Sequence, residues 1–134
     1  MTDAFDADID KVTGRIRDEI PGIVSVYLFG SIAKGTYDEN SDYDIAVIVN
    51  ELPEDDIGKI SNIRYSLLDQ LKRPLDIVIL ALSDLEHPSP LLYEIYHSRK
   101  LIYGQDILTT FKNVIADMKP VTVDGATVGY YVGY

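Results

Sequence analysis

Three short runs of almost uninterrupted apolar residues set the strongest limit on what this chain can fold into. They span residues 23–29 (IVSVYLF), 43–49 (YDIAVIV) and 74–80 (PLDIVIL), and all three are rich in β-branched side chains. Runs of this length and composition are typical of buried strands. The sequence therefore predicts a sheet whose central strands are covered by other elements.

Helical patterns separate these runs. Apolar residues recur at intervals of three and four over 3–20 and again over 53–71, and two shorter helices are expected after Pro90 and over 107–118. The segment KLIYG at 100–104 has the pattern of a short edge strand. This order predicts an α/β (α+β) fold with a mixed three- to four-stranded sheet, and we expect its helices to pack mainly on one face.

The C-terminal segment KPVTVDGATVGYYVGY differs from the rest of the chain. Asp124-Gly125 lies between alternating β-formers, which is a hairpin signal. We therefore expect one domain over residues 1–118, followed by a tail or hairpin over 119–134. Two interpretations of the tail stay open: a terminal hairpin, or a strand that docks a partner.

The charge of the chain narrows its partners. Lysine and arginine total 12 against 22 acidic residues, for a formal net charge of −10. Because nucleic-acid binding depends largely on basic side chains that neutralise phosphates, no direct binding to a long nucleic acid is expected. Divalent cations or a basic protein are the natural complements of such a surface.

Composition also bears on the cellular compartment. The chain has no cysteine, so neither disulfides nor thiolate metal sites hold it together. No apolar run approaches the roughly 20 residues needed to cross a bilayer, and the acidic N-terminus lacks the pattern of a signal peptide. We expect a cytoplasmic protein without a membrane association.

Two aspartates stand where the second apolar run begins. Side chains two positions apart on a strand share a face, so Asp42 and Asp44 should present their carboxylates together. Asp76 lies in the third run and joins them if the two strands are neighbours; the alternative is an ion pair of Asp76 with Arg73 or Lys72. Three carboxylates on two strands can hold two metal ions, of which Mg²⁺ suits oxygen ligands best.

A glycine-containing turn precedes these aspartates. The first apolar run ends at Gly30-Ser31, where a strand enters a short helix, and Gly35 follows. A turn of this kind offers backbone N–H groups and a hydroxyl to a phosphate, and glycine allows the ligand to approach closely. Turn and aspartates together predict a site where a metal-held nucleoside triphosphate is attacked at phosphorus.

The segment GSIAKGTYDENSDYDIAV resembles the signature of the DNA polymerase β-like nucleotidyltransferase superfamily: Gly-Ser, ten residues, then Asp-x-Asp. The fixed points of that pattern are met by Gly30, Ser31, Gly35, Ser41, Asp42 and Asp44. The resemblance extends over roughly residues 9–104 and points to the minimal nucleotidyltransferases, which are often encoded beside a HEPN-type toxin. It implies the polymerase β-like fold.

The resemblance implies the nucleotide-binding residues. Gly30 and Ser31 would hold the β- and γ-phosphates of ATP, and Lys34, Gly35 and Ser41 are further candidates. Many minimal members carry arginine at the position of Lys34, and lysine lacks the bidentate fork of arginine.

The metal ligands and the base are implied in the same way. Asp42 and Asp44 would bind metal ions, with two Mg²⁺ expected, and Asp76 would complete the metal site. Asp76 would also help to deprotonate the attacking hydroxyl. The group transferred would be AMP from ATP, with pyrophosphate as the leaving group.

Three functions remain as alternatives. By resemblance, the acceptor is a tyrosine of a cognate HEPN ribonuclease toxin, which makes this chain an antitoxin that acts as an enzyme. A binding module that neutralises a toxin by contact alone is the second. Adenylylation of a small hydroxyl compound, such as an aminoglycoside, is the third. Base preference and homo-oligomerisation stay open.

Overall fold

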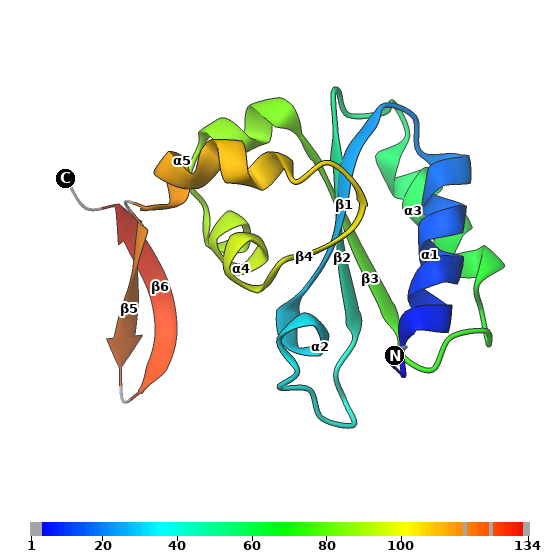
Figure 1. Cartoon of the computed structure of the whole chain (residues 1–134), viewed down its shortest axis with the longest axis horizontal. Helices are drawn as coiled ribbons and strands as arrows, with labels where there is room; N and C mark the ends of the chain where they lie inside the picture. The colour runs from blue at the N-terminus through cyan, green and yellow to red at the C-terminus, as the bar shows by residue number, and fades with distance from the viewer. Residues whose placement is uncertain (1–3, 117, 124, 133–134) are drawn as a thin grey trace.

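The computed structural model describes residues 4–116, 118–123 and 125–132 (Figure 1). The elements follow in the order α1 (Asp6–Glu19), β1 (Ile23–Phe29), α2 (Gly30–Lys34), β2 (Tyr43–Val49), α3 (Asp56–Ser66), β3 (Leu75–Ala81), the 3-10 helix η1 (Leu82–Glu86), α4 (Pro90–Ser98), β4 (Lys100–Gly104), the 3-10 helix η2 (Ile107–Phe111), α5 (Lys112–Ala116), β5 (Met118–Val123) and β6 (Ala126–Val132).

The central feature is a four-stranded sheet with the strand order β3-β2-β1-β4. β2 and β3 are parallel, whereas β1 is antiparallel to both β2 and β4. The predicted α/β fold with a mixed sheet is therefore confirmed. Within the parallel pair, Asp44 lies opposite Asp76, and across the antiparallel pair Asp44 lies opposite Phe29.

Helices cover both faces of this sheet, whereas the sequence led us to expect them mainly on one. α1 and α3 lie on one side of the sheet, and α4 and α5 lie on the other (Figure 1). The cause is visible in β2, where Ile45 and Val47 enter the core with α1, while Ala46 and Ile48 enter the core with α4. A strand that is apolar on both faces needs cover on both.

Two predicted helices are shorter in the structure. The segment predicted over 53–71 ends as helix at Ser66, and the turns that follow include Asp69 with φ of 62°, a left-handed conformation that a helix does not continue through. The segment predicted over 107–118 divides into η2 and α5.

The C-terminal strands form a sheet of their own. β5 and β6 pair antiparallel as a two-stranded ribbon, separate from the four-stranded sheet. Asp124 of the predicted turn lies outside the described residues, and Gly125 has φ of 82°. A domain boundary at 118/119 stays a prediction. Across the described ranges, no helix has both the length and the apolar character that a bilayer crossing requires.

Candidate active site

The three predicted aspartates lie at one end of the sheet. Asp44 and Asp76 are register partners on the parallel strands β2 and β3, so their side chains leave the same face. That face is the one covered by α4, because Ala46 and Val78, two residues further along each strand, contact the α4 core. Asp42 precedes β2 and stands two residues before Asp44.

The negative charges of Asp42 and Asp76 influence the pKa of Asp44. The pKa of Asp44 is raised above its ordinary value, first by burial and then by the negative charges of Asp76 and Asp42. Both causes disfavour the ionised carboxylate. A cation at this position would relieve both.

Asp76 has a partner that the sequence did not indicate. Its Oδ1 accepts a hydrogen bond from the Arg64 guanidinium at 3.0 Å, whereas Arg73 donates to the carbonyl oxygens of Asp38 and Ser41. Arg64 extends from α3, which packs on the opposite face, and β3 is an edge strand. The side chains of the pair are 48% and 67% exposed, so solvent weakens it and Asp76 stays accessible.

The donor set fits a cation that is shared with a substrate. In the part of the chain that the structure describes, no three histidine, aspartate or glutamate side chains form a ready-made metal cage. Mg²⁺, however, is usually held by one or two carboxylates, waters and substrate phosphates. The mutual repulsion around Asp44 is the chemistry that such an ion compensates.

The Gly-Ser turn is held directly against these carboxylates. Gly30 begins α2 immediately after β1 and has φ of 77°. The backbone conformation favours glycine, and a Cβ at this position would overlap the Asp44 carboxylate and force it to move. The turn and Asp44, which the sequence pattern places together, are therefore in contact.

The N–H group of Gly30 is already used. It donates to the Ser98 hydroxyl at 2.9 Å, from the last residue of α4. The sequence predicted that backbone N–H groups of this turn are available to a phosphate. No local pattern signals the contact, because 68 positions separate the two residues.

The loop between α2 and β2 brings two further predicted residues together. The Ser31 hydroxyl donates to the Ser41 hydroxyl at 2.9 Å, and Ser41 also accepts the Asp38 N–H at 3.0 Å. Gly35 ends α2 with φ of 76°. The loop is thus fastened to the turn through Ser31.

The structure does not bring Lys34 to the aspartates. Lys34 lines a cavity of about 390 Å³ together with Phe5 and Ile9 at the start of α1 and Lys100 of β4. This cavity opens on the α1 side of the sheet, away from the face of Asp44. Its predicted contact with a phosphate gains no support from this placement.

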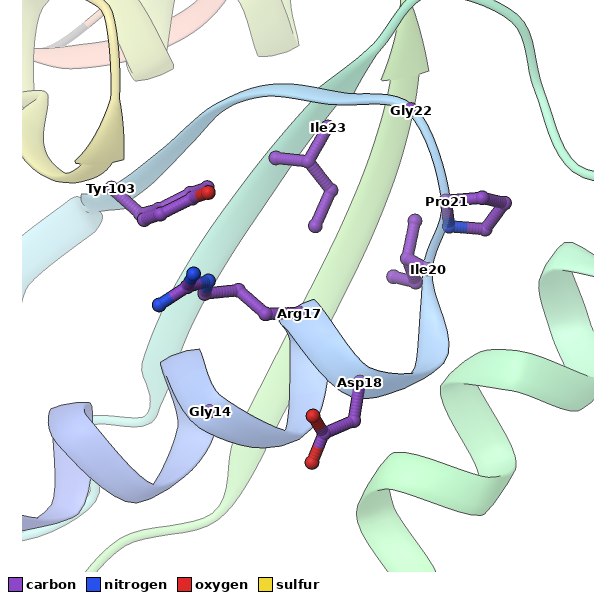
Figure 2. A pocket seen from close by; sticks show the side chains of 8 residues that line it. All are labelled: Gly14, Arg17, Asp18, Ile20, Pro21, Gly22, Ile23 and Tyr103. Carbon is purple, nitrogen blue, oxygen red and sulfur yellow. The ribbon is translucent and has the colours of Figure 1, made fainter.

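A further cavity lies at the other end of β1. It measures about 600 Å³ and surrounds the connection from α1 to β1 (Figure 2). Figure 2 shows the Arg17 side chain directed at the Tyr103 ring, and the guanidinium carbon is 4.3 Å from the ring centroid. Asp18 contributes the only carboxylate among its lining residues, so the cavity is separate from the aspartate site.

Comparison with known families gives a match over most of the chain. The model of the family described as "Polymerase beta, Nucleotidyltransferase" matches residues 11–108. The match includes the turn, Asp42, Asp44, Asp76 and Ser98.

Individual relatives agree with that match. The chain is 29% identical to "Putative protein adenylyltransferase MJ1305" of Methanocaldococcus jannaschii over 134 residues, which cover 92% of this chain and 89% of the relative. It is 40% identical to "Protein adenylyltransferase MntA" of Shewanella oneidensis over 67 residues, 50% of this chain and 44% of that protein. A crystal structure of a toxin-antitoxin with AMP-PNP aligns with a TM-score of 0.59 and 26% identity, covering 81% of this chain and 82% of that one.

Proposed function

The chain belongs to the polymerase beta nucleotidyltransferase family, and from that premise we propose that it transfers AMP from ATP to a hydroxyl group of a partner protein. One observation carries the proposal: Asp44 and Asp76 lie in register on one face, and Asp44 contacts the Gly30 turn. Carboxylates beside a turn of this kind suit a triphosphate with its cation.

We assign the chemistry to the following residues. Asp42 and Asp44 would hold Mg²⁺, with Asp76 at the same site; when bound, the ion neutralises and polarises phosphate oxygens. The turn of Gly30 and Ser31 would position the β- and γ-phosphates, while the Gly30 N–H itself stays bonded to Ser98. The acceptor oxygen bonds to the α-phosphorus while the bond from that phosphorus to pyrophosphate breaks, and an Asp76 carboxylate oxygen takes the hydroxyl proton.

The partner we propose is a HEPN-type toxin, with a tyrosine hydroxyl as acceptor. Support comes from two relatives that are named protein adenylyltransferases and from the toxin-antitoxin structure that shares this fold. The exposed position of Asp76, with a side chain 67% accessible, would allow a hydroxyl on another protein to approach it. The chain would then be an antitoxin that acts by modification.

The test is transfer of radiolabel from [α-³²P]ATP with Mg²⁺ to a purified HEPN-type toxin. We expect labelling by the wild type and its loss by roughly 100-fold or more in Asp42→Asn with Asp44→Asn. Asp10→Asn is the matched control, because Asp10 is an exposed aspartate of α1 away from the site.

Other outcomes would identify the alternatives. If the double variant neutralised the toxin as well as the wild type does, contact alone would be the mechanism. If pyrophosphate were released only with an aminoglycoside, a small hydroxyl compound would be the acceptor.

A further inference from the structure

The contact between α4 and the Gly30 turn deserves a functional explanation because of where it lies. Gly30 is in van der Waals reach of the Asp44 carboxylate, so a small movement of the turn changes its distance from the proposed metal ligand. What fixes the turn therefore affects the geometry of the site. Ser98 contacts the turn directly.

The two hydrogen bonds of Ser98 have a defined direction. Its hydroxyl donates to the carbonyl oxygen of Glu94 at 2.7 Å and accepts the Gly30 N–H at 2.9 Å. A serine hydroxyl has a single hydrogen. The Glu94 carbonyl accepts that hydrogen bond, so an oxygen lone pair of Ser98 faces Gly30. Ser98 is 7% exposed, which excludes most competition from water.

The end of α4 is itself anchored to β1 on the other side of Ser98. Arg99 forms an ion pair with Asp106, with 3.0 Å between Nε and Oδ1, and the Tyr27 hydroxyl donates to the same Oδ1 at 2.7 Å. Tyr27 and Gly30 are three residues apart on the chain. The C-terminal end of α4 is thus attached to β1 at Tyr27 and to the turn at Gly30.

We propose that Ser98 is a positioning residue for nucleotide binding. It holds the Gly30-Ser31 turn at a fixed distance from the Asp44 carboxylate, so that the triphosphate can contact the turn and the carboxylates at the same time. Without the hydroxyl, the part-buried Gly30 N–H would lack its acceptor and the turn would shift towards another one. This inference rests on the proposed function, because it concerns the same nucleotide site.

The chain contains a closely matched control. Ser66 is the last residue of α3, as Ser98 is of α4, and its hydroxyl donates to the Ile63 carbonyl at 2.8 Å. It also accepts a hydrogen bond, from Arg15 Nε at 2.9 Å. Ser66→Ala removes the same kind of donor and acceptor from a helix end on the opposite face of the sheet.

The experiment compares Ser98→Ala, Ser98→Thr and Ser66→Ala with the wild type. Affinity for AMP-PNP with Mg²⁺ is measured by calorimetry, and kcat and KM for ATP are measured in AMP transfer. We expect Ser98→Ala to weaken AMP-PNP binding and to lower kcat/KM by about tenfold, since small misplacements at a site are costly. Ser66→Ala should stay within about twofold of the wild type in both.

Stability separates positioning from a general structural effect. Both alanine variants should lower Tm by a few degrees. Ser98→Thr keeps the accepting oxygen and should restore affinity and kcat/KM. Equal affinities and rates in Ser98→Ala and Ser66→Ala, or no recovery in a folded Ser98→Thr, would overturn the inference.

The Gly30 amide gives a readout that needs neither nucleotide nor acceptor. Its hydrogen exchange should accelerate at least about tenfold in Ser98→Ala and stay unchanged in Ser66→Ala. If the wild type binds AMP-PNP without transferring AMP, the proposed function fails while the role of Ser98 is still decided by affinity. Unchanged exchange at Gly30 in Ser98→Ala would refute the positioning role by itself.

Discussion

Two aspartate centres lie on the α4 side of the sheet, and their charges are compensated to very different extents. Asp106 is held by Arg99, the Tyr27 hydroxyl and the Thr109 hydroxyl, and the hydrogen bond with Arg99 is the largest cause of its lowered pKa. The pKa of Asp44 is raised, first by burial and then by the negative charges of Asp76 and Asp42. One aspartate is stabilised as an anion, whereas the other is destabilised.

Under the proposed function, the Asp106 centre serves the fold and the Asp44 centre would serve the reaction. The Asp106 cluster joins β1 to the segment after β4, and the Leu108 N–H also donates to the Tyr27 hydroxyl at 3.1 Å. Burial, with Asp106 beside it, raises the pKa of Tyr27 to about 12, so this hydroxyl stays protonated. The Asp44 centre contributes no comparable stabilisation. Retaining such repulsion is expected where a bound cation supplies the missing positive charge.

Among substitutions at the two centres, Gly30→Ala at the Asp44 centre is expected to have the largest effect on activity and stability. The new methyl group would overlap the Asp44 carboxylate, in a backbone conformation that disfavours alanine. We expect kcat/KM for AMP transfer to fall roughly 100-fold and the free energy of unfolding to fall by about 1–2 kcal/mol. Steady-state kinetics and urea denaturation measure the two.

Gly14→Ala provides the control for that substitution. Gly14 lies in α1, and a Cβ there would meet no atom within 4 Å. Alanine should therefore raise the free energy of unfolding by about 0.5–1 kcal/mol and leave AMP transfer unchanged. Equal activity of the two alanine variants would contradict the contact between the turn and Asp44 as a requirement of the site.

A smaller effect on activity and stability is expected from Asp106→Asn, at the centre where the carboxylate has partners. The substitution keeps the shape of the side chain and removes the charge that Arg99 and Tyr27 share. We expect the free energy of unfolding to fall by about 1 kcal/mol, a modest value because the Asp106 side chain is 41% exposed. AMP transfer should fall less than in Gly30→Ala. If the loss of kcat/KM, expressed as a free energy, exceeded the loss in the free energy of unfolding, the Asp106 centre would belong to the reaction.

The features of the Asp44 centre that the sequence predicted are those marked by short, local sequence patterns. The Gly-Ser turn and the Asp-x-Asp pair lie within one segment, and the alternation of a strand places Asp42 and Asp44 together. Asp76 needed only the assumption that the second and third apolar runs are neighbouring strands, which the register confirms. The sheet followed from the same runs.

The contacts that the sequence did not predict join distant elements. Arg64 and Asp76 are 12 positions apart on α3 and β3, and Ser98 and Gly30 are 68 positions apart. The periodicity of apolar residues predicts which face of a helix or strand a side chain occupies, but not which other element packs against that face. The role of Lys34 in phosphate binding stays a prediction for a related reason: a helix of five residues has too little periodicity to show which way each side chain points.

The smallest effect concerns pH, and it has opposite signs at the two centres. The ordinary pKa of an aspartate is 3.8, and that of Asp44 is raised in the folded protein. Below 3.8 Asp44 is protonated in both states, so its charge has no influence; as pH rises through the folded pKa, ionisation destabilises the fold. Asp106 has a lowered pKa, so its stabilisation is present above 3.8 and is lost as pH falls through the folded pKa.

Difference measurements isolate the two aspartates from all other titrating groups. The free energy of unfolding of Asp44→Asn, relative to the wild type, should rise as pH increases from 3.8 through the raised pKa of Asp44, because the variant escapes a penalty that the wild type acquires. That of Asp106→Asn should rise towards the wild type as pH falls below about 4, because the wild type loses the advantage that the variant lacks. Urea denaturation across the pH range tests both. Parallel curves for the two variants would mean that the protein treats the two carboxylates alike, and the distinction between a structural and a reactive centre would have to be abandoned.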